Sequence, residues 1–203
     1  MFQKLFGNKP VKVEKKPVVI VSGLPRSGTS MMMKMLAEGG LPFVTDAVRE
    51  ADEDNPNGYF EIEASKALKD GDYSWIYDAQ GKVVKVISYL LEYLPEDLTY
   101  HIIFMDRDIP EILASQKKML ERRSETSAIS DEEMFAQFQE HLRAVKYWVA
   151  RMPNMRIHYV RYTDAINEAG EVAKTISEFL GQPLNIEKMQ AVPTESLYRN
   201  RSK

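Results

Sequence analysis

The chain has 203 residues, of which 44% are hydrophobic and 28% charged, and its formal net charge at pH 7 is −3. These values are ordinary for one globular domain with a substantial core, and the weak negative charge excludes a nucleic-acid binder held by a global basic field. The absence of cysteine excludes disulfides and thiolate metal sites, and it fits a reducing compartment.

We expect a lysine-rich flexible leader at residues 1–16, followed by a single domain over residues 17–203. The leader has no apolar core long enough for a signal peptide, and no apolar run approaches the ~20 residues of a membrane helix. The expectation is therefore a cytoplasmic protein with neither a membrane nor a nucleic acid as partner.

The first element is an apolar strand that runs into a glycine loop. Residues 18–21 are four consecutive aliphatic side chains, typical of a strand buried on both faces, and the unbranched run after Thr29 predicts a helix. Gly23 and Gly28 let the loop curl, so its N–H groups and the positive end of the helix dipole converge on one spot. The pattern predicts a phosphate site, and the alternative is a strand–turn–helix corner without a ligand.

The two glycines have Walker A spacing, but Thr29 stands where that loop has its lysine. The loop instead carries its own cation, Arg26. Residues 25–30 read Pro-Arg-Ser-Gly-Thr-Ser, which resembles the first nucleotide loop of the sulfotransferases that use 3'-phosphoadenosine-5'-phosphosulfate (PAPS). The resemblance implies that the following residues bind the nucleotide: Pro25, Arg26, Ser27, Gly28, Thr29 and Ser30.

The segment after the first helix is acidic and irregular from residue 43 to residue 57, and it ends in the strong turn signal Asn-Pro-Asn-Gly at 55–58. A short helix is predicted to follow and to end near Asp70. Several aromatic residues could line an apolar acceptor pocket or belong to the core. These are Tyr59, Phe60, Trp75, Tyr77 and Tyr89.

The rest of the chain alternates strands with helices. Strands are predicted at residues 81–86, 101–105 and 155–160, and helices at 88–94, 109–123, 130–153 and 163–180, with capping boxes at Asp108/Glu111 and Ser130/Glu133. This alternation predicts a three-layer α/β sandwich with a central parallel sheet. Ligands bind at the carboxyl ends of such strands, so the segments 23–30, 86–88 and 106–108 are expected to form one cleft.

A second nucleotide element follows the strand at 101–105. Arg107 and Ser115 have the separation at which sulfotransferases read the 3'-phosphate, although Ile109 stands where those proteins have proline. An arginine fork can grip two phosphate oxygens while a serine donates to a third. Arg199 lies in a basic C-terminal stretch that resembles the one that completes the 3'-phosphate pocket, or else in a frayed tail.

The resemblance implies a P-loop NTPase-like fold. It also implies transfer of a sulfuryl group from PAPS to a hydroxyl or amine of a small-molecule or glycan acceptor. The second product is 3'-phosphoadenosine-5'-phosphate (PAP), and no metal is expected. Arg26 is then expected to neutralise the leaving 5'-phosphate by charge and hydrogen bonding alone, because arginine stays protonated. A noncatalytic binder of the bisphosphate nucleotide, or a small-molecule kinase with the same loop, are the alternatives.

The catalytic base is not fixed by the sequence. In one branch of the family a histidine lies two residues after a strand-end lysine, but here Ile87 follows Lys85 at that spacing. Residues 58–61 resemble a Gly-Tyr-Phe-Glu element of bacterial members, so Glu61 is favoured, with Glu50 second. Lys85 comes next, because a desolvated lysine beside Arg26 would have a lowered pKa. We expect structural or surface roles for the three histidines, His101, His141 and His158.

Overall fold

The structure, a computed structural model, describes residues 16–46, 58, 60 and 62–194. Its centre is a four-stranded sheet in the order β2-β1-β3-β4, in which every neighbouring pair is parallel. The strands are β1 (Val18–Gly23), β2 (Val83–Lys85), β3 (Tyr100–Asp106) and β4 (Met155–Arg161). The loops that follow β1, β2 and β3 therefore leave one edge of the sheet side by side.

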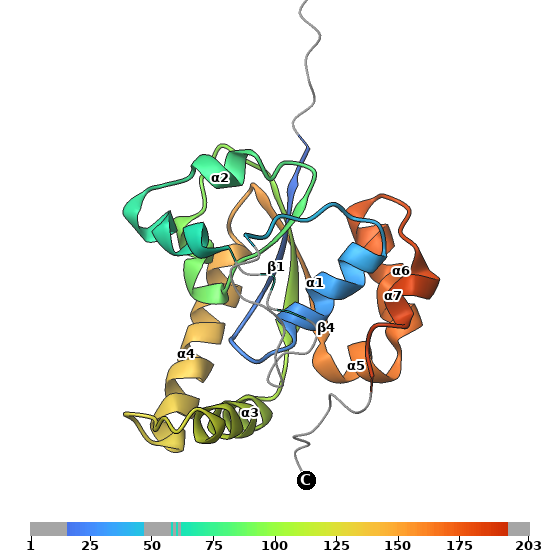
Figure 1. The fold of residues 1–203 in the computed structure, drawn as a ribbon. Coiled ribbons are helices and arrows are strands. Elements are labelled where there is room, and N and C mark those ends of the chain that lie inside the picture. The colour runs from blue at the N-terminus through green and yellow to red at the C-terminus, as the bar shows by residue number, and fades with distance from the viewer. Residues whose placement is uncertain (1–15, 47–57, 59, 61, 195–203) are drawn as a thin grey trace, which may run out of the picture.

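Helices cover both faces of the sheet, as Figure 1 shows. One face is covered by α1 (Thr29–Glu38), α5 (Tyr162–Asn167), α6 (Ala169–Leu180) and α7 (Ile186–Gln190). The other side carries the 3₁₀ helices η1 (Glu63–Asp70) and η2 (Ser88–Tyr93), with α2 (Ser74–Tyr77), α3 (Ile109–Arg122) and α4 (Asp131–Val149). The predicted three-layer α/β sandwich is confirmed.

The sequence of β1 explains why it lies between these layers. Val19 and Val21 pack into the cluster under α1 and α6, whereas Val18 and Ile20 pack into the cluster under η2 and α4. All six residues of the strand are buried. A strand covered on both faces has no polar side, and this produces the uninterrupted aliphatic run in the sequence.

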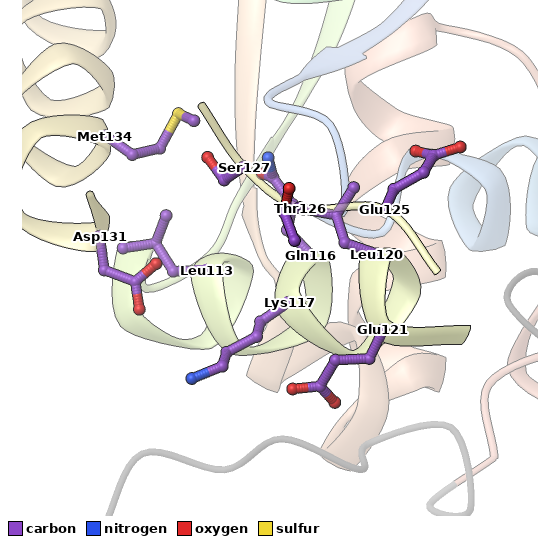
Figure 2. A pocket seen from close by; sticks show the side chains of 10 residues that line it. All are labelled: Leu113, Gln116, Lys117, Leu120, Glu121, Glu125, Thr126, Ser127, Asp131 and Met134. Atoms are coloured by element: carbon purple, nitrogen blue, oxygen red, sulfur yellow. The ribbon is translucent and has the colours of Figure 1, made fainter. Parts of the chain in front are cut away.

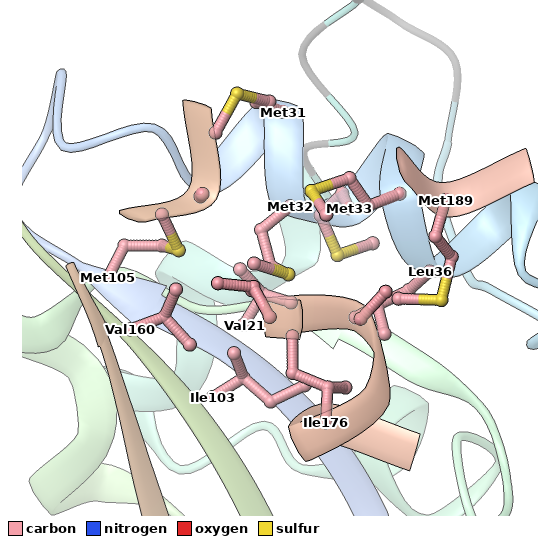
Figure 3. Packing of buried hydrophobic residues seen from close by; sticks show 14 of the residues in the cluster. Val21, Met31, Met32, Met33, Leu36, Ile103, Met105, Val160, Ile176 and Met189 are labelled. Atoms are coloured by element: carbon pink, nitrogen blue, oxygen red, sulfur yellow. The ribbon is translucent and has the colours of Figure 1, made fainter. Parts of the chain in front are cut away.

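Methionines fill much of the core beneath α1. Met31, Met32 and Met33 of this helix, with Met105 and Met189 from other elements, pack around aliphatic side chains of the strands and of α6 (Figure 3). Flexible thioether side chains fill irregular gaps between helix and sheet. Burial of each contributes about 1.5–3 kcal/mol. This packing holds the first turn of α1 at the carboxyl edge of the sheet.

Two predicted helices differ from the structure. The helix expected at 88–94 is the 3₁₀ helix η2, in which Ser88 and Leu91 are buried at the three-residue spacing of that helix type, and the C-cap residue Leu94 is buried as well. The helix expected at 163–180 is interrupted at Glu168, whose φ of −130° and ψ of 38° are not helical. Its apolar periodicity continues across the break, which conceals the break in the sequence.

The two predicted capping boxes had different outcomes. At the start of α4, Ser130 Oγ accepts a hydrogen bond from the Glu133 amide at 3.2 Å, as predicted. At the start of α3, the prediction is wrong, because the Asp108 side chain makes no capping hydrogen bond. The Glu111 carboxylate forms an ion pair with Arg107 instead, which draws it toward the cleft rather than toward the helix terminus.

Candidate functional site

The loop between β1 and α1 has a backbone that few residues other than glycine can adopt. Gly23 and Gly28 have φ angles of 148° and 102°. A Cβ on Gly28 would lie 2.6 Å from Tyr162 Cδ2, and one on Gly23 would lie 2.8 Å from the Met105 carbonyl oxygen. The loop is therefore pressed against β3 and α5, which fixes its curvature. Arg26 itself has a left-handed φ of 70°.

Polar atoms of this loop fit a phosphate. Ser27 Oγ is buried and has no hydrogen-bond partner among the described residues, which is costly unless a ligand supplies one. Thr29 and Ser30 begin α1, whose N-cap Gly28 provides no side-chain cap. The amides of a first helical turn lack acceptors within the helix, so they and the hydroxyl groups point to a bound anion.

Arg26 reaches from this loop to α3. Its Nε donates a hydrogen bond to Ser115 Oγ at 3.1 Å, and Ser115 is itself buried. The two residues are far apart in the chain, and the contact places the loop cation directly beside the serine predicted for the 3'-phosphate. The residues predicted for the first and second nucleotide elements are thus in direct contact.

Arg107 is held from three sides. Its Nε donates to the Glu111 carboxylate at 3.0 Å, its Nη1 donates to the Arg26 carbonyl oxygen at 3.2 Å, and its guanidinium lies 4.1 Å from the centre of the Tyr162 ring. The side chains of Arg107 and Glu111 are only 6% and 2% exposed. Burial is the main cause that raises the pKa of Tyr162, so its hydroxyl stays protonated near neutral pH. The geometry orients the guanidinium before any ligand arrives.

Lys85 lies on the opposite side of the loop. It ends β2, which pairs with β1, and its Nζ donates a hydrogen bond to Ser30 Oγ at 3.3 Å. The residue is 7% exposed. Arg26 of the loop, Arg107 after β3 and Lys85 of β2 therefore bring three cations from different segments to the loop, and this concentration of positive charge suits a ligand with several phosphate or sulfonate groups.

A serine and a histidine form a pair that the sequence did not predict. Ser88 Oγ lies 2.9 Å from His141 Nε2, and the Tyr89 ring stacks on the imidazole with centroids 3.5 Å apart. Burial lowers the pKa of His141. The available signal was weak: Ser88 follows a strand end, and His141 falls one turn after Phe138 on the apolar face of the predicted helix.

Three predicted residues lie outside the described part of the chain, namely Glu50, Glu61 and Arg199. Of the aromatic candidates for an acceptor pocket, Trp75 and Tyr89 pack against core clusters. Tyr77 donates its hydroxyl hydrogen to Asp97 at 2.8 Å on the surface. Phe60 packs edge-on against Phe43. Tyr59 also falls outside the described residues.

His101 and His158 lie away from the site. Both rings pack against Phe179 of α6, with centroids 5.6 Å and 5.3 Å from it. Burial lowers the pKa of each. Both histidines are partly buried, and their ring contacts agree with the expected structural roles.

A cavity of about 300 Å³ lies between α3 and the start of α4 (Figure 2). Leu113, Gln116, Lys117 and Leu120 line it from one stripe of α3, and Met134 lines it from α4. None of Arg26, Lys85, Arg107 and Ser115 takes part in its lining. This cavity is separate from the cluster of cations around the loop.

The described residues include neither a metal-binding cluster nor a membrane-spanning helix. They contain no group of three or more histidine and carboxylate side chains arranged to hold a metal ion. None of the described helices has the length and apolar composition needed to cross a membrane.

Comparisons with known proteins identify the type of domain. The sulfotransferase domain family matches residues 16–203. The sulfotransferase domain of the olefin synthase from Synechococcus PCC 7002 is 15% identical, with 94% of this chain and 82% of that chain covered and a TM-score of 0.55. The sulfotransferase domain from the curacin biosynthetic pathway is also 15% identical, with coverage of 85% and 76% and a TM-score of 0.51. At these identities the two structures show a shared fold, and a search of curated proteins found no match.

Proposed function

The chain belongs to the sulfotransferase family, and we propose that it transfers a sulfuryl group from PAPS to a hydroxyl or amine of a small-molecule or glycan acceptor. The products are PAP and the sulfated acceptor. One observation carries the proposal: the Nε of Arg26 in the β1–α1 loop bonds Ser115 Oγ, while Arg107 bonds the carbonyl oxygen of Arg26. The groups assigned to the two phosphates of one nucleotide are thereby in direct contact.

The nucleotide is assigned to the loop and to α3. The loop amides with the hydroxyl groups of Ser27, Thr29 and Ser30 would hold the 5'-phosphate, and Arg107 with Ser115 would hold the 3'-phosphate. Pro25 and Gly28 shape the loop. Arg199 is proposed to complete the 3'-phosphate pocket, as its sequence context suggests.

Charge stabilisation is assigned to two cations. Arg26 is part of the loop, and Lys85 reaches it from the end of β2. Both are assigned to the negative charge that develops on the bridging oxygen as the sulfur–oxygen bond breaks. Because both cations belong to the chain, the proposal includes no metal ion. The hydrogen bond from Lys85 to Ser30 supports a role in charge stabilisation, while the sequence-based hypothesis for the base is Glu61.

Turnover with radiolabelled PAPS tests the proposal. The purified protein should transfer label to at least one member of a panel of phenols, alcohols, amines and glycans, and the Arg26→Ala variant should not. Transfer by neither protein, together with tight binding of PAP, would favour the second candidate function.

That second candidate is a noncatalytic binder of the bisphosphate nucleotide. It is favoured by one observation, the aliphatic Ile87 at the position where the small-molecule branch of the family has its histidine. A kinase has less support, because Thr29 takes the place of the Walker lysine. Phosphate transfer from ATP to any acceptor would reverse that order.

A further inference from the structure

Transfer of a sulfuryl group to a neutral hydroxyl releases a proton, and the site needs a group that accepts it. Among the described residues around the loop, Arg26 and Lys85 are cations with assigned contacts, and Arg107 forms an ion pair. The carboxylates of Asp106 and Glu111 are ion-paired with Lys146 and Arg107. The neutral pair Ser88 and His141 is a further group that can accept a proton.

The pair lies on the β2 side of the loop. Ser88 comes three residues after Lys85, at the carboxyl edge of the sheet. Phe138, one turn before His141, packs in a cluster with Leu24 of the loop, and Tyr89 packs against the same cluster while stacking on the imidazole. Phe138 and Tyr89 thus connect the surroundings of the imidazole with Leu24 of the loop that carries Arg26.

The position suits the acceptor side of the reaction. Arg107 and Ser115 lie beyond the loop on the β3 side and are assigned to the nucleotide. An acceptor that attacks sulfur in line with the leaving 5'-phosphate must approach from a different direction. This approach is assigned to the β2 side, where Ser88 follows the strand. His141 is half-buried and Ser88 is 1% exposed, so the imidazole rather than the serine is accessible.

We propose that His141 is the catalytic base that takes the proton from the acceptor hydroxyl, and that Ser88 is a positioning residue that fixes the orientation and tautomer of the imidazole. This inference rests on the proposed function. It differs from the sequence-based hypothesis, which placed the base at Glu61.

In the proposed step, His141 is the tautomer whose Nε2–H donates to Ser88 Oγ, and the lone pair on Nδ1 accepts the acceptor's proton. The acceptor oxygen forms a bond to sulfur while the bond from sulfur to the bridging oxygen breaks, and the electron pair leaves with the 5'-phosphate beside Arg26. Burial lowers the pKa of His141 against a smaller opposing effect of Glu92, which keeps the ring neutral and able to accept a proton near pH 7.

The experiment compares two acceptor probes that differ in their need for a base. Phenol must lose its proton during transfer, whereas p-nitrophenol is largely ionised at pH ~8 and needs no base. With phenol, His141→Gln should lower kcat ~10²–10⁴-fold, while transfer to p-nitrophenol should fall less than ~3-fold on the same scale. PAP affinity and melting temperature should stay close to those of the wild type.

Two further variants, Ser88→Ala and Glu61→Gln, are compared with His141→Gln for turnover of the same two phenols. Ser88→Ala should lower kcat for phenol without raising KM, should shift the acidic limb of its pH profile, and should spare p-nitrophenol; Ser88→Thr, which keeps the hydroxyl, should restore the profile. Glu61→Gln should not reproduce the difference between the two probes that His141→Gln shows.

Three outcomes would overturn the inference. Equal loss with both phenols in His141→Gln would show a structural role for the imidazole. A loss confined to Glu61→Gln would return the base to that residue. A wild-type protein that sulfates neither the phenols nor any other acceptor would overturn the proposed function itself, and the inference with it.

Discussion

The two sides of the β1–α1 loop differ in how their groups are connected. On the β3 side, charged residues bind one another closely: Arg107 contacts the Glu111 carboxylate and the carbonyl oxygen of Arg26, and Arg26 contacts Ser115. On the β2 side, Lys85 is the charged group, and the neutral pair Ser88 and His141 joins η2 to α4. The functions proposed above divide along this difference, with binding and orientation of anions assigned to one side and proton transfer to the other.

The largest expected effect is at Arg26, where the two sides meet. Arg26→Ala should lower turnover on the order of 10³-fold with the melting temperature nearly unchanged, because the side chain stabilises developing charge rather than the core. Arg26→Lys is the matched control, since it keeps the charge but loses the fork, and it should retain partial activity. Full activity in Arg26→Ala, measured with radiolabelled donor, would remove its catalytic role.

On the β3 side, the next largest effect is expected from removing the ion pair between Arg107 and Glu111. Arg107→Gln leaves the Glu111 carboxylate buried without its partner, which should destabilise the fold by about 3–5 kcal/mol. The double variant Arg107→Gln/Glu111→Gln removes both charges and should recover most of that loss in urea unfolding. Both variants should bind PAP weakly. Equal stability of the single and double variants would show that the pair is not buried as described.

A smaller effect on thermal stability is expected from the backbone geometry at Gly28 in the loop, and Gly40 provides a matched control. Gly28→Ala introduces a Cβ 2.6 Å from Tyr162 Cδ2 at a φ of 102°, whereas Gly40→Ala has a similar φ of 94° and no atom within 4 Å. Strain from a positive φ costs about 1–3 kcal/mol in both, so thermal unfolding should show the additional steric cost in Gly28→Ala alone. Identical melting temperatures would mean that the loop is not pressed against Tyr162.

The smallest expected effect is on the pH dependence of stability, which is assigned to His101 and His158 and not to the proposed catalytic base. Burial lowers the pKa of His101 and His158 in the folded state, so below about pH 6.5 the unfolded chain binds more protons than the folded one and stability falls. Melting temperature should therefore be level above that pH and decline below it. His101→Phe/His158→Phe should flatten the decline while leaving the pH profile of turnover in place, because both rings lie on the α6 side of the sheet.

Local motifs allowed the β3 side to be predicted from the sequence. The loop at residues 25–30 is contiguous, and Arg107 and Ser115 occupy one strand end and the helix after it, at the separation that the resemblance to sulfotransferases singles out. The fold class followed from the alternation of strands with helices. The capping role of Glu111 was mispredicted, because a nearby buried arginine competes for its carboxylate more strongly than the helix terminus does.

The β2 side depends on tertiary packing. His141 lies in α4, 53 residues beyond Ser88, and nothing in either local sequence specifies that the two meet. Their contact follows from the packing of α4 on η2 and on the cluster around Leu24. A hydrophobic face can be recognised in a helix from its periodicity, but the partner of a polar residue within that face cannot.

The central claim, that the two elements bind one bisphosphate nucleotide, is tested most directly by calorimetric titration of the wild-type protein with PAP and with 5'-AMP, which lacks the 3'-phosphate. Charge-assisted contacts to that phosphate contribute about 1.5–3 kcal/mol, so PAP should bind roughly ten- to a hundredfold more tightly. Equal affinity for the two nucleotides would contradict the account.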